Sequence, residues 1–449
     1  MNPKRIIADI IDFNPTRSIK RGEKKPFIDM ASIQANFRDI TNYVYREYKG
    51  GGSRFSNGDT LFARITPCLE NGKTAKINCL PENEIGHGST EFIVMSAKEP
   101  EYDEDFIYYL SRLPHFRAYA QSRMEGTSGR QRVTWQSLAD YKIEYPEREI
   151  RRRIGSFLRV IDDKILQNTK INQTLEQIAQ AIFKNWFVDF NPVEAKIDVF
   201  QSGGTQEEAE RTAMSVISGK NKKTLESFRK ENPEGYAKLK ETAALFPAGM
   251  VDSELGMIPE GWEVGSLGDV YDITMGQSPK GTSYNEAGEG TLFFQGRAEF
   301  GWRYPKPRLY TTDPKRMASN GDVLMSVRAP VGDLNIALSD CCVGRGLAAL
   351  KSKVGGTTYS YYQLRNIQRY FERFNAEGTV FGSINQKDLK SIKVIVPDEK
   401  LINRFLYVVG KMDKQIESLS QQVNSLETIR DTLMPKLLTG ELLINGESE

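Results

Sequence analysis

The sequence has few of the side chains that most often carry catalysis or bind metal. Its 449 residues include four cysteines and two histidines. No pair of cysteines has the spacing of a zinc knuckle. His87 and His115 leave little material for a metal site, a Ser-His-Asp triad or a Cys-His pair. We therefore predict no metal site and no catalytic residue in this chain.

Long apolar runs are also missing. No stretch approaches the roughly 18 apolar residues that would indicate a membrane span. The opening segment, "MNPKRIIADIIDFNPT", carries Asp9 and Asp12 within its apolar part, which does not fit a secretory signal. With 39% hydrophobic and 27% charged residues, the composition is typical of a globular protein. These features predict a cytoplasmic protein with no membrane partner.

One segment looks like a nucleotide-binding loop but lacks its essential glycine. "RITPCLENGKTAKI" at 64–77 contains Gly72–Thr74, which match the last three letters of a Walker A motif. A phosphate-binding loop needs a glycine five positions earlier, and Pro67 stands there instead. Proline has a fixed φ and offers no N–H to a phosphate. The nuclease-like letters Asp398–Lys400 are contiguous, whereas a metal-dependent nuclease spreads them over strands. We predict neither activity here.

The chain contains an internal repeat. Five segments of the first half recur in the same order, at a nearly constant distance, in the second half. They are 7–22 with 267–281, "NGDTLFARITP" at 57–67 with "NGDVLMSVRAP" at 320–330, "GHG" at 86–88 with "GRG" at 344–346, "EGT" at 125–127 with "EGT" at 377–379, and "LADYKIEYP" ending at Pro146 with "LKSIKVIVP" ending at Pro397. Each match alone is weak, because such letters are common in turns. Together they indicate two copies of one domain.

Each copy has short alternating segments bounded by Gly, Asn, Pro and Asp, which are typical of strands. Apolar residues at helical spacing predict one helix over 103–123, with a partner over 358–374. The expected fold class is α+β, with two similar mixed α/β domains.

A long helical segment follows each copy. Apolar residues recur at heptad spacing from Ile154 and again from Phe405, interrupted by Asn168, Asn172 and Arg430. The seam residues that we expect at the helix pair or at a partner interface are Ile161, Ile165, Leu175, Ile182, Trp186, Met412, Ile416, Leu419, Val423 and Leu426. About 40 helical residues span about 60 Å and leave an apolar stripe that needs a partner. We expect an antiparallel coiled coil with pseudo-twofold symmetry. Pairing with another chain remains the alternative.

These patterns divide the chain into five parts. The first domain covers 1–147 and the first long helix 148–190. A charged linker with short surface helices, and without a core of its own, covers 191–250. The second domain covers 251–398, and the second long helix with a tail covers 399–449.

Several of these segments resemble the specificity subunit of a type I restriction-modification enzyme. They include "GDTLFARITPCLENGKTAKI", "GSTEFIVM", "GTSGRQRVTWQSLADYKIEYP", "INQTLEQIAQAIFKNWFVDF", "LGMIPEGWEVGSLGDV" and "GDVLMSVRAPVGDLNIA". The resemblance covers nearly the whole chain. It implies two target recognition domains, each reading one half of a split DNA site, with the helices setting the gap.

The resemblance also implies partners. Two methyltransferase subunits would dock on the helical regions, and restriction subunits that translocate and cut DNA would join through them. S-adenosylmethionine, ATP and Mg²⁺ would belong to those partners, and this chain would bind no cofactor. In agreement, the sequence has no Asp/Asn-Pro-Pro-aromatic motif of an amino-methyltransferase.

Recognition of double-stranded DNA needs cations for phosphates and planar or amide side chains for base edges. The net charge of +2 argues neither for nor against DNA binding, so local clusters of residues must be used to find the contacts. In the first copy we select Asn71, Lys73, Lys76, Arg123, Arg130, Gln131 and Arg132. In the second copy we select Gln295, Arg297, Arg303, Arg328 and Arg345. The spans between landmarks differ in length between the copies, which predicts an asymmetric target.

Two rival functions stay open at this point. The same domains could bind DNA or protein as an adaptor of another phage-defence complex, which steep salt dependence of DNA binding would argue against. A nuclease or NTPase is disfavoured by the missing motifs, and turnover with Mg²⁺, ATP or S-adenosylmethionine would revive it.

Overall fold

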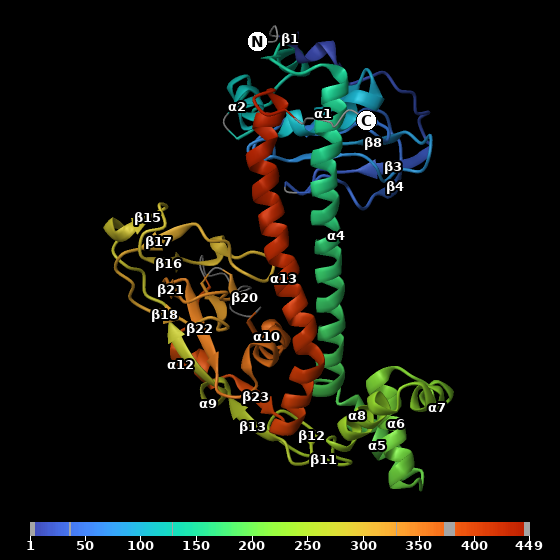
Figure 1. Ribbon diagram of the computed structural model, residues 1–449, viewed down its shortest axis with the longest axis vertical. Coiled ribbons are helices and arrows are strands. Elements are labelled where there is room, and N and C mark those ends of the chain that lie inside the picture. Colours follow the sequence, from blue (N-terminus) through green and yellow to red (C-terminus); the bar gives the residue numbers. More distant parts are fainter. Residues whose placement is uncertain (1–4, 36, 128, 329, 372–381, 444–449) are drawn as a thin grey trace. The chain divides into compact units, whose positions relative to one another are not determined.

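The computed structural model describes residues 5–443 except 36, 128, 329 and 372–381. The chain divides into two compact units, Met1–Lys170 with Leu419–Glu449, and Ile171–Ser418. Two helices of 40 residues, α4 (Arg148–Phe187) and α13 (Glu399–Leu438), pass through both units (green and red in Figure 1). We call the β-rich parts of the two units the first and second head.

The first head contains two four-stranded sheets. One has the order β2 (Ile11–Phe13), β9 (Phe92–Ala97), β6 (Thr60–Ala63), β7 (Thr74–Lys76), and all its pairs are antiparallel. The other has the order β4 (Val44–Glu47), β3 (Lys24–Ile28), β8 (Gly86–Gly88), β5 (Ser53–Phe55), and its β3–β8 pair is parallel.

The second head repeats this arrangement. One sheet has the order β14 (Tyr271–Met275), β22 (Leu347–Ser352), β19 (Val323–Val327), β20 (Val331–Ile336). The other has the order β15 (Tyr284–Asn285), β17 (Leu309–Thr311), β16 (Thr291–Phe294), β21 (Cys341–Val343), β18 (Met317–Ala318), and its β16–β21 pair is parallel. Apart from the added edge strand β15, the strand order of the first head recurs, as the sequence repeat predicts.

One landmark of the repeat was paired wrongly. "GHG" forms β8, where His87 lies opposite Phe27, and the equivalent pair in the second head is Cys342 opposite Phe293. The structural counterpart of "GHG" is therefore Cys341–Val343, and "GRG" forms the turn that follows it. The predicted pairing of "GHG" with "GRG" was wrong because both segments have one larger residue between two glycines. The second "EGT", at 377–379, lies outside the described residues.

Short elements complete the two heads. They are β1 (Arg5–Ile6) paired with β10 (Lys142–Ile143), α3 (Trp135–Ala139), β13 (Glu263–Ser266) paired with β23 (Lys393–Val396), α9 (Leu267–Val270), α12 (Gln386–Ser391), the strand pair β11 (Met250–Val251) and β12 (Ile258–Pro259), and the 3-10 turns Ile7–Asp9, Gly281–Ser283 and Arg297–Glu299. The helix expected over 103–123 is two helices, α1 (Pro100–Arg112) and α2 (Pro114–Ser122), because Pro114 cannot continue α1. Its partner is α10 (Gly356–Asn366). The end of the range expected for that partner lies outside the described residues.

Each head packs on the long helices through an apolar core. In the first unit, Phe106 and Tyr109 of α1 share a core with Leu158 of α4 and Leu437 of α13. In the second unit, Phe183 and Trp186 of α4, Phe405 of α13 and Tyr359 of α10 lie in one core. The aromatic ring of Phe405 is 5.7 Å from that of Phe183 and 6.1 Å from that of Trp186.

The long helices run antiparallel. In the first unit, Asp162 contacts Arg430 and Asn168 contacts Gln422. Residues later in α4 therefore contact residues earlier in α13. Of the predicted seam, Ile161, Ile165, Trp186 and Ile416 are buried, and Leu175, Ile182, Met412, Leu419, Val423 and Leu426 are half-buried. Asn168 and Asn172, the polar interruptions on α4, are buried as well.

The segment between the copies is a small helical bundle. It consists of α5 (Asn191–Gln201), α6 (Gln206–Ser218), α7 (Lys222–Glu231) and α8 (Pro233–Ala244). Ala213, Met214, Leu225 and Ala243 form its own core. The expectation of a linker without a core was therefore wrong, because a few apolar residues suffice when short helices share them. None of the helices in the described part of the chain has the length and apolarity needed to cross a membrane.

Candidate nucleic-acid interface

Three loops meet at one edge of the first head. The N–H of Arg64 donates to the carbonyl of Glu91 at 3.0 Å, and the N–H of Val133 donates to that of Arg64 at 3.0 Å. The N–H of Thr66 donates to the carbonyl of Gln131 at 3.1 Å. We call this region, Arg64–Thr66 with Ser89–Glu91 and Gly129–Val133, the first loop edge. Its backbone is fixed by hydrogen bonds, so its side chains project from defined positions.

The predicted basic segment of the first copy forms a hairpin at this edge. Glu125 and Arg132 exchange two backbone hydrogen bonds of 2.9 Å. Arg123 and Arg130 are exposed, and Gln131 is half-buried. The Arg132 guanidinium lies 2.7 Å from Glu91, so its charge is already paired. The structure thus brings Arg130, Gln131 and Arg132 together at the first loop edge.

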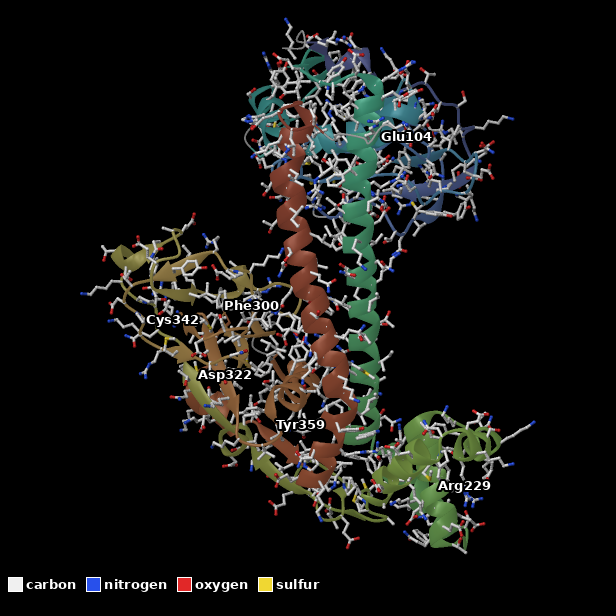
Figure 2. The ribbon with its side chains drawn as sticks, viewed as in Figure 1. Glu104, Arg229, Phe300, Asp322, Cys342 and Tyr359 are labelled. Carbon is white, nitrogen blue, oxygen red and sulfur yellow. The ribbon has the colours of Figure 1, made fainter. Side chains whose placement is uncertain are left out.

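The turn with Walker-like letters connects β6 to β7. Asn71 is exposed there, and the Lys73 ammonium donates to the carbonyl of Met30 at 2.8 Å. Lys76 is 4% exposed, and its ammonium lies 2.5 Å from Asp105 and 3.3 Å from Glu104, labelled in Figure 2. A buried lysine that neutralises two carboxylates cannot reach DNA without leaving them uncompensated. We therefore leave Lys76 out of the set proposed below.

The second head builds an equivalent edge from the same kinds of contact. The N–H of Val327 donates to the carbonyl of Gly346 at 2.9 Å, and the N–H of Ile384 donates to that of Val327 at 3.1 Å. The N–H of Gly344 donates to Phe294 at 2.8 Å. We call Phe294–Gln295, Val327–Arg328 and Gly344–Gly346 the second loop edge. Val327 takes the place that Arg64 has in the first head.

Glycines let the chain segments of this second edge pass close together. A Cβ at Gly276 would lie 2.1 Å from the carbonyl oxygen of Gly344, and one at Gly344 would lie 2.7 Å from that of Gln295. Neither position can carry a side chain without a shift of backbone. Arg345, directly after Gly344, therefore sits on a closely supported turn and is exposed.

The predicted residues of the second head fall into two groups. Gln295, Arg328 and Arg345 are exposed at the second loop edge. Arg297 is exposed and forms an ion pair with Asp333. Arg303, in contrast, is 1% exposed and lies 2.7 Å from Asp413 of α13. Because Arg303 is buried and paired, we leave it out of the proposed DNA-contacting set.

Sequence reasoning missed Arg54 and Arg64, which line a cavity beside the first loop edge. A comparison of the two repeat copies could have identified Arg64. Where "TLFARI" has Arg64 after an apolar strand, "VLMSVR" has Val327. A cation at a position that is apolar in the sister copy is a candidate for a specific role.

Burial displaces the pKa of two groups in the heads, a histidine and a thiol, that could otherwise act as a base or a nucleophile. Burial lowers the pKa of His87, whose Nε2 lies 3.2 Å from the carbonyl oxygen of Arg46. Burial raises the pKa of the Cys341 thiol to about 12, and all four cysteines are free. A thiol with so high a pKa is a poor nucleophile at neutral pH. Within the described part of the chain, no three His, Cys, Asp or Glu side chains gather as a metal site.

The fold and these edges define a class of protein: a duplicated recognition protein whose two heads share a scaffold and carry different side chains. The chain belongs to the family of type I restriction modification DNA specificity domains, whose model matches residues 5–177 and 259–427. Members of this family are specificity subunits of type I restriction-modification complexes and are not themselves catalysts.

Individual relatives agree with this assignment. The HindI specificity subunit of Haemophilus influenzae is 29% identical over 436 residues, which are 91% of this chain and 90% of the relative. The putative MjaX specificity subunit of Methanocaldococcus jannaschii is 44% identical over 200 residues, or 43% of this chain and 46% of the relative. The crystal structure of the type I S subunit from M. genitalium has a TM-score of 0.50 at 14% identity, covers 97% of this chain and 96% of its own, and supports the fold.

Proposed function

We propose that this subunit recognises a split, asymmetric DNA sequence, with one half-site read by each head. The observation that carries the proposal is the repeated construction of the loop edges. The backbone bonds of Arg64 with Glu91 and Val133 recur as those of Val327 with Gly346 and Ile384. The two heads thus share a backbone scaffold and carry different projecting side chains. This arrangement suits two domains that bind the same polymer, DNA, at two different base sequences.

The side chains at and near the two loop edges have the chemistry that such reading requires. In the first head the proposed contacts are Asn71, Lys73, Arg123, Arg130, Gln131 and Arg132, and in the second head Gln295, Arg297, Arg328 and Arg345. Glutamine and arginine form paired hydrogen bonds with adenine and guanine in the major groove, and lysine and arginine neutralise phosphates. Because the two sets differ, we expect two different half-sites.

The long helices would set the distance between the half-sites. Each has 40 residues and would span about 60 Å at about 1.5 Å per residue. At about 3.4 Å per base pair, this length limits the separation of the half-sites to about 17 base pairs.

We further propose that two methyltransferase subunits dock on the helical regions, and that restriction subunits join through them. Family membership supports this, and so do apolar side chains left exposed on both helices. These are Phe157, Val160, Ile178, Tyr407 and Ile429, from 40% to 63% exposed. S-adenosylmethionine, ATP and Mg²⁺ would then be bound by the partners.

Co-expression with the neighbouring methyltransferase subunit tests the function. We would map N6-methyladenine in host DNA by single-molecule sequencing and expect one split motif, methylated in both halves. A variant with Arg328 and Arg345 both changed to Gln should alter or weaken only the second half-site, and the first half-site serves as the internal control. A complex that assembles but methylates nothing would contradict the proposal and favour the adaptor function.

A further inference from the structure

A small cavity lies beside the first loop edge. Its volume is about 210 Å³, and the polar residues that line it include Asn14, Ser53, Arg54, Arg64 and Thr90. Since one water takes about 30 Å³, this space can hold a phosphate group with several waters. We call it the Arg64 cavity. All its residues belong to the first unit.

Within the described residues, Arg64 has no partner for its charge. Its Nε is buried without a hydrogen-bond acceptor, and within the described residues its guanidinium makes no ion pair. A buried donor left unpaired costs about 1–3 kcal/mol. Its main-chain N–H and carbonyl are both engaged, with Glu91 and Val133, so the position of the residue is fixed. An unpaired guanidinium on a fixed backbone indicates a site that an external acceptor completes.

Arg54 adds a second cation to the cavity. Its Nη1 donates to the carbonyl of Arg17, and no carboxylate pairs with it in the described part of the chain. The nearby acids are already engaged: Asp59 lies 2.7 Å from Arg17, and Glu91 lies 2.7 Å from Arg132. Two arginines therefore line the Arg64 cavity, and among the described residues no carboxylate forms an ion pair with either.

Neutral donors also line the cavity. The side-chain oxygen of Asn14 accepts from the N–H of Val94 at 2.9 Å, which leaves the amide nitrogen of Asn14 as a donor. Thr90 is exposed and offers a hydroxyl. Gly52, with φ of +76°, passes so close to β8 that a Cβ would lie 2.3 Å from the carbonyl oxygen of Gly88. The wall of the cavity therefore depends on that glycine.

We propose that the Arg64 cavity binds one phosphate of the DNA backbone beside the first half-site. This inference rests on the proposed function and adds the ligand of one defined site. A phosphodiester is an anion with several acceptor oxygens, which matches two guanidinium groups and neutral donors. A recessed site suits a protruding phosphate, whereas base edges lie inside the grooves.

Among the described residues of the second head, neither arginine of the Arg64 cavity has an arginine as its counterpart. Val327 stands in the place of Arg64, and Met317, which lies opposite Cys342 as Arg54 lies opposite His87, stands in the place of Arg54. The phosphate contact therefore anchors only the first head. It fixes register on the duplex and carries no sequence information of its own.

The test uses the complete complex with methyltransferase subunits and a duplex that contains the methylated motif. We would measure affinity from 50 to 300 mM KCl for wild type, Arg64→Met and Arg64→Lys. Each phosphate contact contributes about −0.9 to the slope of log K against log salt. Arg64→Met should bind about tenfold more weakly at physiological salt and lose about one from the slope, with the methylation motif unchanged. Arg64→Lys, which keeps the charge, should retain the slope.

Arg229→Gln, an exposed arginine on α7 labelled in Figure 2, is the matched control and should change neither quantity. Equal Tm values of wild type and variants would show that the first head is folded in each of them. A changed base in the methylation motif of Arg64→Met would mean that Arg64 reads a base, and an unchanged slope and affinity would mean that it contacts no DNA. Either result overturns the inference.

A further measurement distinguishes binding of a DNA phosphate from binding of free inorganic phosphate. If inorganic phosphate raises the Tm of wild type but not of Arg64→Met, while both have the same salt slope on DNA, the cavity serves a free phosphate and the inference is wrong. Failure of the proposed function is distinct, because the wild-type complex itself would then give no split motif.

Discussion

At the scale of single residues, a carboxylate on each long helix, buried at Asp162 and half-buried at Asp413, is held by a tyrosine of the adjoining head. The Tyr109 hydroxyl donates to Asp162 of α4 at 2.7 Å, and the Tyr362 hydroxyl donates to Asp413 of α13 at 2.9 Å. In the second head, Arg303 also lies 2.7 Å from Asp413. Buried charges are tolerated only when paired and hydrogen-bonded, so these contacts fix how each head sits on its helix.

We expect Arg303→Met to destabilise the second unit by about 3–5 kcal/mol, because it leaves the Asp413 carboxylate without its cation. Arg297→Met, which removes an exposed ion pair with Asp333, should cost less than about 1 kcal/mol. Urea unfolding of both variants measures the difference. Equal stability of the two, together with weaker DNA binding by Arg303→Met, would return Arg303 to the DNA-contacting set.

Lys76 and Arg303 show why the site is predicted less well than the fold. Both are cations beside repeat landmarks, and the sequence alone does not reveal that Asp105 and Asp413, far away in the chain, come within 2.7 Å of them. Arg64 was missed for the opposite reason. It follows an apolar strand, where the pattern indicates burial, and only the structure reveals that its Nε has no partner.

At the scale of elements, polar pairs interrupt the helix seam at defined levels. Arg430 of α13 is 3% exposed and lies 2.7 Å from Asp162 of α4, and Asn168 donates to Gln422 at 3.3 Å. The heptad pattern predicted the interruptions at Asn168 and Arg430 but could not supply their partners. Polar residues on a coiled-coil seam cost stability and fix register, so these pairs align the two helices.

A double-mutant cycle would test the Asp162–Arg430 pair. Arg430→Met alone should cost about 3–5 kcal/mol because Asp162 stays buried and charged. Combining it with Asp162→Leu should recover most of that loss, although Tyr109 then lacks its acceptor. Urea unfolding of the two single variants and the double variant gives the coupling energy. Additive losses would show that the pair does not act as a unit.

At the scale of the whole molecule, the repeat and the long helices were predictable because they depend on order and periodicity. The strand order around β6 recurs around β19, as the repeat predicts. The two segments with heptad spacing form the long helices α4 and α13. The bundle α5–α8 was not predictable as a core, because its buried residues are few and are spread over three short helices. Periodicity reveals long apolar stripes and misses a core that short helices build together.

The proposed reading of one half-site by each head can be tested through the gap between the half-sites. If α4 and α13 hold the heads at a fixed distance, adding or removing two base pairs between the half-sites shifts one by about 7 Å and turns it by roughly 70° around the DNA axis. Both heads could then no longer engage together, and the gain from bivalent binding, on the order of 10²-fold or more, would be lost. Fluorescence anisotropy of the complex on duplexes of altered gap measures this, with a duplex that carries one half-site as the control. Affinity that stays equal across the altered gaps would mean that the helices do not act as a rigid spacer.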